Sequence, residues 1–216
     1  MPVEQVRHQQ AGQVVAVPPV VAVVVEAVVA GKAAARYVVL LRGVNVGGNN
    51  RVPKTAFQAV LEGLGFHDVV IYINSGNAVF TSSRQPTSHE IQAALESYFG
   101  FTIPALVLSG ERIKAIAAAI PSDWTNDAPK PDKSGQKSDV LYLFDEINVP
   151  GVIKDLGHKP EIEQMIYVDG AVLTNVTRLN QSKGSLQKLI ATPFYKQITI
   201  RNITTAKKLA ELVDAV

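Results

Sequence analysis

Residues 37–48, YVVLLRGVNVGG, decide the fold of this chain. Their first five residues form a continuous apolar run, which is typical of a short, buried strand. The glycines and Asn45 that follow favour a tight turn. Pro53 is suited to the first turn of a helix, and the apolar residues after it share one helix face, namely Phe57, Val60, Leu61 and Leu64. The stretch therefore predicts a buried strand, a glycine-rich loop and an amphipathic helix.

The elements that follow complete a recognisable order. Two apolar runs separated by Asn74-Ser75-Gly76-Asn77 indicate a β-hairpin. Thr87 and Glu90 have the spacing of a capping box at a helix start. A strand is expected at 105–108 and a further helix from Ser109 to Ile120. The order is β-α-β-β-α-β-α, and its first six elements match the split βαβ, or ferredoxin-like, unit.

The second half of the chain has a similar order. Strands are expected at 140–144, in a hairpin at 164–173 and at 198–200, with helices at 149–156, around 186–190 and at 206–213. We therefore predict an α+β sandwich of two ferredoxin-like βαββαβ(α) repeats, with mostly antiparallel sheets packed by helices. Convergence on a common α/β pattern is the alternative to duplication. The expected segments are an N-terminal extension at 1–35, a first βαββαβα unit at 36–120, a polar linker at 121–138 and a second βαββαβα unit at 139–216.

The N-terminal 35 residues differ from the rest in composition. Residues 14–29 are rich in valine and alanine but are broken by Pro18-Pro19 and Glu26, so they are too short and too charged to span a membrane. We expect a flexible extension or a start assigned too far upstream. A signal peptide is the alternative, because Ala33-Ala34-Ala35 follows an apolar stretch.

Composition limits the classes of function. Hydrophobic residues make up 47% of the 216 residues and charged residues 19%, which suits a globular core and excludes disorder of the whole chain. The absence of cysteine excludes disulfides and thiolate chemistry and favours a cytoplasmic location. The net charge of +2 is too small, taken alone, to imply a nucleic-acid partner.

The glycine-rich loop and the hairpin turn form the candidate ligand site. In a βαββαβ unit the first two strands point the same way, so the loop and the turn emerge at the same edge of the sheet. Backbone N–H groups there can bind an anion, and an arginine adds a bidentate contact. The Gly-x-x-x-Gly-Gly spacing is neither a dinucleotide fingerprint nor a phosphate loop, so a turn without a ligand is the alternative. The candidate residues are Arg42, Gly43, Asn45, Gly47, Gly48, Ser75, Gly76 and Asn77.

A second polar set consists of Arg178, Ser182, Lys183, Arg201 and Asn202. It is a candidate second anion site, and helix capping with a solvated basic face is the alternative. Trp124 either stacks on a ligand or packs onto the core.

Catalytic and metal-binding patterns are lacking in the sequence. The four histidines are scattered without metal spacing, and no nucleophile motif surrounds Ser75. We therefore expect no metal and no cofactor. Whether the protein is an enzyme stays open, because active sites assemble in space.

Three stretches resemble the bacterial family called domain of unknown function 1697 (DUF1697). They are residues 37–48, residues 72–80, and Arg201-Asn202 with the helix at 208–212. Gly184 and Ile203 replace a leucine and an aromatic residue of the family pattern. The resemblance covers about residues 37–216. It implies a cytosolic α/β protein with no established activity, and it indicates no substrate.

We therefore expect a binding protein for a small phosphorylated or carboxylated ligand such as a nucleotide. A nucleic-acid-binding module is one alternative, although only 6% of the residues are aromatic. A structural or oligomeric protein without catalysis is the other. No membrane partner is expected, and the oligomeric state is left open.

Overall fold

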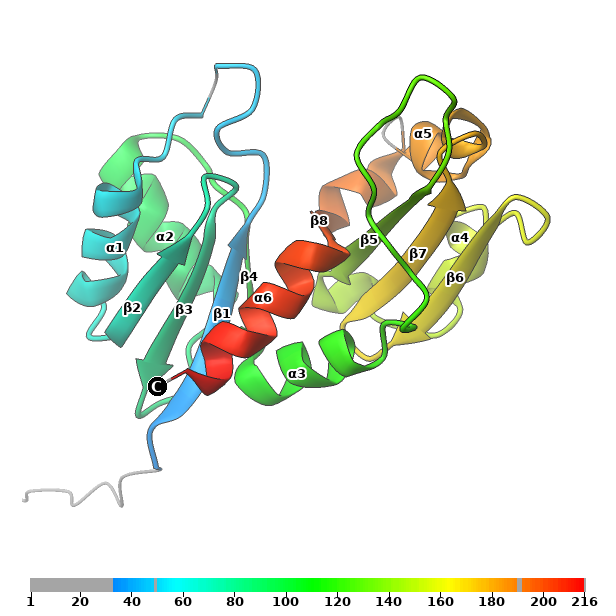
Figure 1. Cartoon of the computed structure of the whole chain (residues 1–216). Coiled ribbons are helices and arrows are strands. Elements are labelled where there is room, and N and C mark those ends of the chain that lie inside the picture. Colours follow the sequence, from blue (N-terminus) through cyan, green and yellow to red (C-terminus); the bar gives the residue numbers. More distant parts are fainter. Residues whose placement is uncertain (1–32, 49, 190–191, 216) are drawn as a thin grey trace, which may run out of the picture. The chain divides into compact units, whose positions relative to one another are not determined.

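The computed structural model of the chain describes residues 33–48, 50–189 and 192–215. The segment Lys32–Val216 forms one compact unit, drawn in Figure 1. Most of the predicted N-terminal extension lies outside the described residues, and the first strand begins at Ala35. In the part of the chain that the structure describes, none of the helices has the length and apolarity needed to span a membrane.

The first half contains a four-stranded antiparallel sheet with strand order β2-β3-β1-β4. Its elements follow the predicted order: β1 (Ala35–Leu41), α1 (Lys54–Gly63), β2 (His67–Tyr72), β3 (Asn77–Ser82), α2 (Ser88–Phe99), β4 (Ala105–Ser109) and α3 (Gly110–Ala118).

The second half contains another four-stranded antiparallel sheet, with strand order β6-β7-β5-β8. Its strands are β5 (Gln136–Leu143), β6 (Glu163–Val168), β7 (Ala171–Thr177) and β8 (Ile198–Asn202). Its helical segments are η1 (Asp145–Ile147), α4 (Val152–Asp155), η2 (Gln181–Lys183), α5 (Leu186–Leu189), η3 (Pro193–Gln197) and α6 (Ile203–Asp214). An α+β fold with two antiparallel sheets and helices is thereby confirmed.

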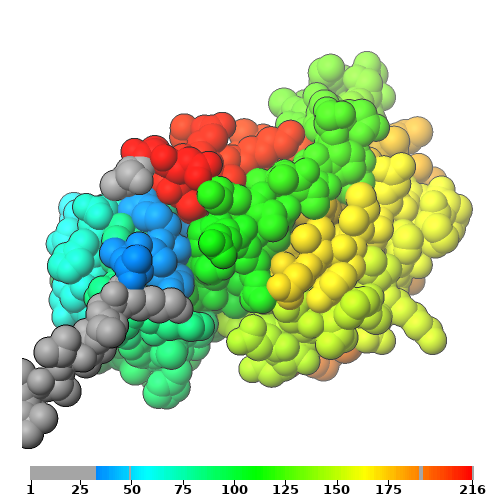
Figure 2. Space-filling view, turned by 90° about the horizontal axis from the view of Figure 1, so that it is seen from below, coloured from blue at the N-terminus to red at the C-terminus, as the bar shows by residue number. Residues whose placement is uncertain are grey.

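Strands β1 and β5 are covered on both faces of their sheets, which explains their continuous apolar runs. Successive side chains of a strand point to opposite faces. In β1, Val39 and Leu41 pack in the core under α1 and α2, whereas Val38 and Leu40 pack in a core shared with α3 and α6. Val140 and Tyr142 of β5 enter the same shared core. Helices α3 and α6 lie against each other between the two sheets (Figures 1 and 2).

The predicted capping box is confirmed, and two further helix ends have local causes. The Thr87 side chain and Glu90 form the capping box of α2. Ser109 accepts a hydrogen bond from the backbone N–H of Arg112 and caps α3. Gly65, at φ +81°, follows the end of α1 in the left-handed conformation.

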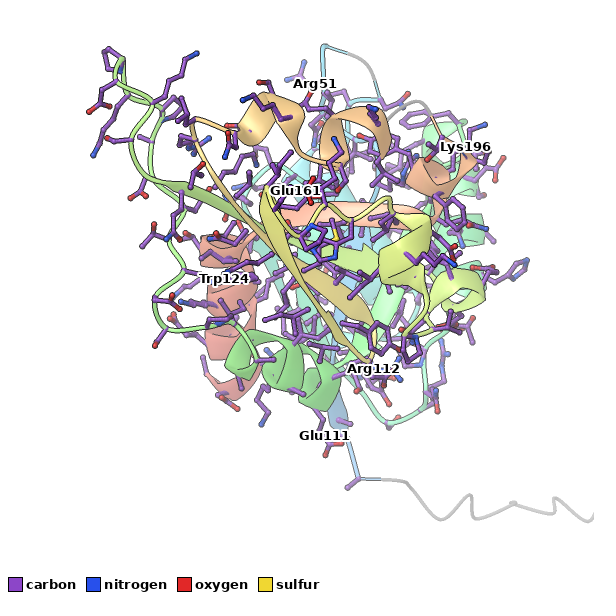
Figure 3. All side chains as sticks on the ribbon, turned by 90° about the vertical axis from the view of Figure 1, so that its right-hand side faces the viewer. Arg51, Glu111, Arg112, Trp124, Glu161 and Lys196 are labelled. Carbon is purple, nitrogen blue, oxygen red and sulfur yellow. The ribbon has the colours of Figure 1, made fainter. Side chains whose placement is uncertain are left out.

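The structure corrects one expectation in the second half and decides the role of Trp124 in the linker before it. The helix expected at 149–156 is reduced to Val152–Asp155, because Pro150 disfavours helical conformation in the residue before it. Trp124 is only 4% exposed, and its indole N–H donates to Oε1 of Gln164 at 3.0 Å. Trp124, labelled in Figure 3, therefore packs onto the core and is not available for stacking on a ligand.

Candidate functional site

The glycine-rich loop and the first hairpin turn are in contact. The backbone N–H of Leu41 donates to the carbonyl oxygen of Gly76 at 2.7 Å. The side-chain amide of Asn45 donates to the carbonyl oxygen of Asn74, also at 2.7 Å. The two segments therefore lie at one edge of the first sheet, where the strand directions place them.

Asn45 stabilises the loop itself. Its Oδ1 accepts from the N–H of Val52 at 2.9 Å, and its Nδ2 donates to the carbonyl oxygen of the same residue. Asn45 has a φ of +55°, and Gly43, Gly47 and Gly48 also have positive φ. Asparagine and glycine tolerate this conformation. These four residues thus shape the loop, and the amide of Asn45 is occupied by backbone groups.

Gly76 and Asn77 are also structural. Asn77 is fully buried, and its amide donates to the carbonyl oxygen of Tyr72 and to Oγ of Ser75, at 3.1 and 3.0 Å. A Cβ atom on Gly76 would lie 2.7 Å from Cβ of Leu41. The expectation that these two residues contact a ligand is therefore corrected, because both are enclosed by the turn that they form.

Arg201 reaches this turn from strand β8 of the other half. Its Nε donates to Oδ1 of Asn77 at 2.5 Å, and its Nη2 donates to the carbonyl oxygens of Leu41 and Ser75, both at 2.8 Å. Its Nη1 donates to Oγ1 of Thr199 and to the carbonyl oxygen of Ile200. All five N–H groups of the guanidinium therefore have protein acceptors.

The environment of Arg201 is largely closed to solvent. The residue is 8% exposed, and burial lowers its pKa to about 10, so the guanidinium keeps its charge at neutral pH. Beside it, burial raises the pKa of Tyr142 above the usual value, and the hydroxyl of Tyr142 is buried without a hydrogen-bond partner among the described residues. Arg201 joins the halves, and although it lines a cavity beside Arg42, its N–H groups already donate to protein oxygens.

Arg42 has a different position. Its Nε donates to the carbonyl oxygens of Tyr195 and Ile198, both at 3.1 Å. Its guanidinium carbon lies 4.8 Å from the centroid of the Tyr195 ring, in a cation–π contact. Within residues 33–48, 50–189 and 192–215, Nη1 and Nη2 of Arg42 have no hydrogen-bond partner. The side chain is therefore held by its inner nitrogen while its outer nitrogens stay available.

A cavity of about 310 Å³ lies beside Arg42. It brings together Arg42, Gly43 and Ser75 from the first predicted set and Arg201 from the second, with residues that the sequence did not indicate, above all Tyr195 and Thr199. Tyr195 was missed because it lies about 150 residues away in a short helix without a motif. The one available signal in the sequence was that Tyr195 lies shortly before Arg201, a residue of the second predicted anion set.

The second predicted anion set is not brought together. Arg201 contacts the first half, and Asn202 caps α6 by accepting from the N–H of Thr205 at 2.8 Å. Ser182 and Lys183 lie in η2, where the carbonyl oxygen of Lys183 accepts from Nζ of Lys159. Capping and packing therefore explain Arg201 and Asn202, and Ser182 lines a different hollow.

A larger hollow, of about 510 Å³, is less suited to an anion. It lies between the N-termini of α2 and α3 and includes Arg112 and Asp145. The guanidinium of Arg112 is paired with the carboxylate of Asp169 at 2.7 Å, and Asp145 adds a second negative charge. In Figure 3, Arg112 of α3 lies beside the turn of the β6–β7 hairpin. Among the described residues, no group of three histidine or acidic side chains is placed to bind a metal.

Comparisons with known proteins place the chain in a family. The family model described as "Protein of unknown function (DUF1697)" matches residues 34–173, more than half of the chain. The conserved bacterial protein SP0830 from Streptococcus pneumoniae is 30% identical, with a TM-score of 0.66 over 84% of this chain and 99% of that chain. Protein BT0572 from Bacteroides thetaiotaomicron is 12% identical, with a TM-score of 0.21 over 81% of this chain and 96% of that chain. No curated protein matches. The chain belongs to the DUF1697 family of proteins of unknown function.

Proposed function

We propose that this protein binds a small ligand that combines a phosphate or carboxylate with an apolar ring, such as a nucleotide, in the cavity beside Arg42. One observation carries the proposal. The inner nitrogen of Arg42 is held by two carbonyl groups, whereas Nη1 and Nη2 have no partner among the described residues and the residue lines the cavity. The proposal concerns binding and assigns no reaction.

Preorganisation supports this role for Arg42. An arginine that is already fixed loses little conformational freedom on binding, so more of the interaction energy is available as affinity. Its planar fork matches the geometry of a carboxylate or phosphate. Stacking on the Tyr195 ring keeps the guanidinium in this orientation.

The rest of the lining suits the other part of such a ligand. Val44 and Val46 come from the glycine-rich loop, and Val46 is 70% exposed. With the ring of Tyr195 they offer apolar contacts to a base or another ring. Ser75 and Gly43 add polar groups from the hairpin turn and the loop. Few polar groups in a mainly apolar cavity are typical of small-molecule sites.

Calorimetric titration with a panel of nucleotides, sugar phosphates and carboxylates tests the proposal. The Arg42→Met variant should bind the best ligand about 10- to 100-fold more weakly, because a hydrogen bond to a charged group contributes about 1.5–3 kcal/mol. Arg51→Met is the matched control, since Arg51 is an exposed arginine on the same connection (Figure 3). The proposal fails if no compound binds, or if both variants bind like the wild-type protein.

We also propose that the two halves are ferredoxin-like copies of one unit. The corresponding strand orders, β2-β3-β1-β4 and β6-β7-β5-β8, support this. An equivalent backbone hydrogen bond joins the first strand of each half to its hairpin turn, from Leu41 to Gly76 and from Leu143 to Gly170. Superposition of the halves in an experimental structure tests the proposal, which requires these four residues to coincide pairwise.

A cytoplasmic location remains part of our proposal, and the absence of cysteine supports it.

A further inference from the structure

Three cationic side chains line a separate hollow of about 380 Å³ in the second half. Lys130 and Lys133 come from the loop before β5, and Arg178 follows β7. The remaining lining is Pro129, Leu179, Gln181, Ser182 and Gln187. Figure 1 shows this loop extending beside α5. The hollow shares no lining residue with the Arg42 cavity.

Arg178 connects the two segments that form the hollow. Its backbone N–H donates to the carbonyl oxygen of Gly135 at 2.9 Å, and its Nη2 donates to the carbonyl oxygen of Asp127. Its Nη1 donates to Oε1 of Gln181 at 3.0 Å. Within the loop, the N–H of Lys133 donates to the carbonyl oxygen of Lys130 at 3.0 Å, which closes a turn. The two lysines are therefore held on one loop that Arg178 ties to the sheet.

Asp127 and Asp132 accept hydrogen bonds from groups of the same loop and from the start of β5. Oδ2 of Asp127 accepts from Oγ1 of Thr125 at 2.7 Å and from the N–H of Gln136 at 2.8 Å. These hydrogen bonds lower the pKa of Asp127, which stays ionised at neutral pH. Oδ1 of Asp132 accepts from the N–H of Ser134 at 3.0 Å. Neither carboxylate lines the hollow.

The three cations make the hollow positive, with the ionised carboxylate of Asp127 close enough to Lys130 and Arg178 for their charges to contribute to its lowered pKa. In the part of the chain that the structure describes, neither Lys130, Lys133 nor Arg178 has a carboxylate within ion-pair distance, unlike Lys114, Lys137 and Lys208 elsewhere. No aromatic residue lines the hollow, so its chemistry favours recognition of charge over stacking of a base. Gln181, Ser182 and Gln187 add hydrogen-bonding groups beside the three cations.

We infer that this hollow is a binding site for a ligand that presents more than one phosphate group. A lysine ammonium offers a compact charge to each phosphate, and the arginine adds a directed contact. A volume of about 380 Å³ is within the range of small-ligand sites. The phosphates belong either to a free polyphosphate or to the backbone of a nucleic acid, and the experiment below separates these sources. The inference does not depend on the function proposed for the Arg42 cavity.

Fluorescence anisotropy with a labelled 12-nucleotide oligothymidine, and competition by pyrophosphate, ATP or orthophosphate, tests the inference. The wild-type protein should bind a multiply phosphorylated probe more tightly than orthophosphate. If the oligonucleotide fills the site with about three phosphate contacts, the salt slope for a single strand is about −2, so affinity should fall roughly 20-fold between 50 and 200 mM salt. If pyrophosphate binds at least as tightly as ATP and the oligonucleotide do, the ligand is a free polyphosphate. Preference for the oligonucleotide identifies a nucleic-acid backbone.

Variants separate this hollow from general charge effects. K130E/K133E should weaken binding at least tenfold, and K130Q/K133Q should lower the salt slope by about 1.4, since each lysine–phosphate pair adds about 0.7 to that slope. The control K154E/K207E changes the net charge of the protein as much as K130E/K133E does, at exposed positions on α4 and α6. Thermal unfolding checks that each variant is folded. Arg42→Met should leave this binding unchanged, which separates failure here from failure of the function proposed above. Absence of binding by every probe at 50 mM salt, or an equal weakening in the control, overturns the inference.

Discussion

The two hairpin turns of the molecule each receive an arginine from the other half of the chain. The turn at Ser75 and Gly76 accepts hydrogen bonds from Arg201 at the end of β8. The turn at Asp169 and Gly170 pairs with Arg112 in the first turn of α3. In both contacts an arginine of one half reaches the hairpin turn of the other, once from a strand and once from a helix, and the surroundings differ.

The first contact is buried and the second is exposed. Arg201 is 8% exposed and donates only to uncharged oxygens, so its removal leaves several buried acceptors without a donor. The side chains of Arg112 and Asp169 are 36% and 63% exposed, so water can replace either partner. The number of buried groups left unsatisfied, more than the formal charge, therefore determines how strongly an arginine joins the halves.

The strands beside the two turns show a related difference. Val38 pairs with Leu108 in the first sheet, whereas Val140 pairs with Arg201 in the second. The residues two positions further along the central strands are Leu40 and Tyr142, and both are fully buried. The second sheet therefore carries polar groups where the first has only apolar ones, and these groups serve the contact between halves.

The largest expected effect is at the buried arginine. Arg201→Met should lower the free energy of unfolding by about 3–5 kcal/mol, because it leaves Oδ1 of Asn77 and the carbonyl oxygen of Ser75 without their donor and removes the shorter of two hydrogen bonds to the carbonyl oxygen of Leu41. Urea denaturation measures the change. A loss below about 1 kcal/mol, as expected for an exposed pair, would show that the buried arginine joins the halves no more strongly than the exposed one.

Substitution of the turn glycines should also destabilise the buried turn more than the exposed one. Gly76 has φ +74° and its Cβ would meet Cβ of Leu41 at 2.7 Å, whereas a Cβ on Gly170, at φ +92°, would meet the flexible Cδ of Arg112 at 2.8 Å. We expect Gly76→Ala to cost about 3 kcal/mol and Gly170→Ala about 1 kcal/mol, since only the second clash is relieved by a side-chain movement. Thermal or urea unfolding of the two variants compares them directly. Equal losses of stability would show that the positive φ angle alone, and not the clash of the added Cβ atom, determines the effect of each substitution.

Removal of the orphan hydroxyl should act in the opposite direction. Tyr142→Phe should leave stability unchanged or raise it by up to about 1 kcal/mol, because the buried hydroxyl has no hydrogen-bond partner among the described residues. Tyr167→Phe is the matched control, since the hydroxyl of Tyr167 donates to Oδ1 of Asn148 at 3.1 Å and its removal should cost about 1 kcal/mol. A clear destabilisation by Tyr142→Phe would indicate that the hydroxyl interacts with Arg201.

The smallest effect is expected at the exposed pair. Arg112→Ala should lower stability by about 0–1 kcal/mol, and the difference from wild type should shrink as salt is raised. Unfolding curves at 50 and 500 mM sodium chloride measure both quantities. A salt-independent loss of several kcal/mol would show that Arg112 contributes through packing on Gly170 and not through its charge.

The candidate site illustrates what residue patterns can and cannot predict. Strand directions alone brought the glycine-rich loop and the Asn-Ser-Gly-Asn turn to one edge, and Asn45 contacts Asn74 there. The roles within the edge were not predictable. Asn77 and Arg42 are both polar residues beside a turn, but one is enclosed and the other lines a cavity, because their environments depend on β8 and η3. The partners that decide these environments, Arg201 for Asn77 and Tyr195 for Arg42, lie more than 100 positions away in the chain.

The sequence by itself determined the order of elements, the buried central strands and the helix caps of α2, α3 and α6. These features depend on neighbours within a few residues, such as Thr87 with Glu90, so their physical causes are local. Only the tertiary structure decided that Arg201 belongs to the first hairpin turn and that Tyr195 holds Arg42. Arg201 and the carbonyl group of Leu41 are 160 positions apart. A contact of that kind depends on how two sheets pack around shared helices, and no local pattern encodes it.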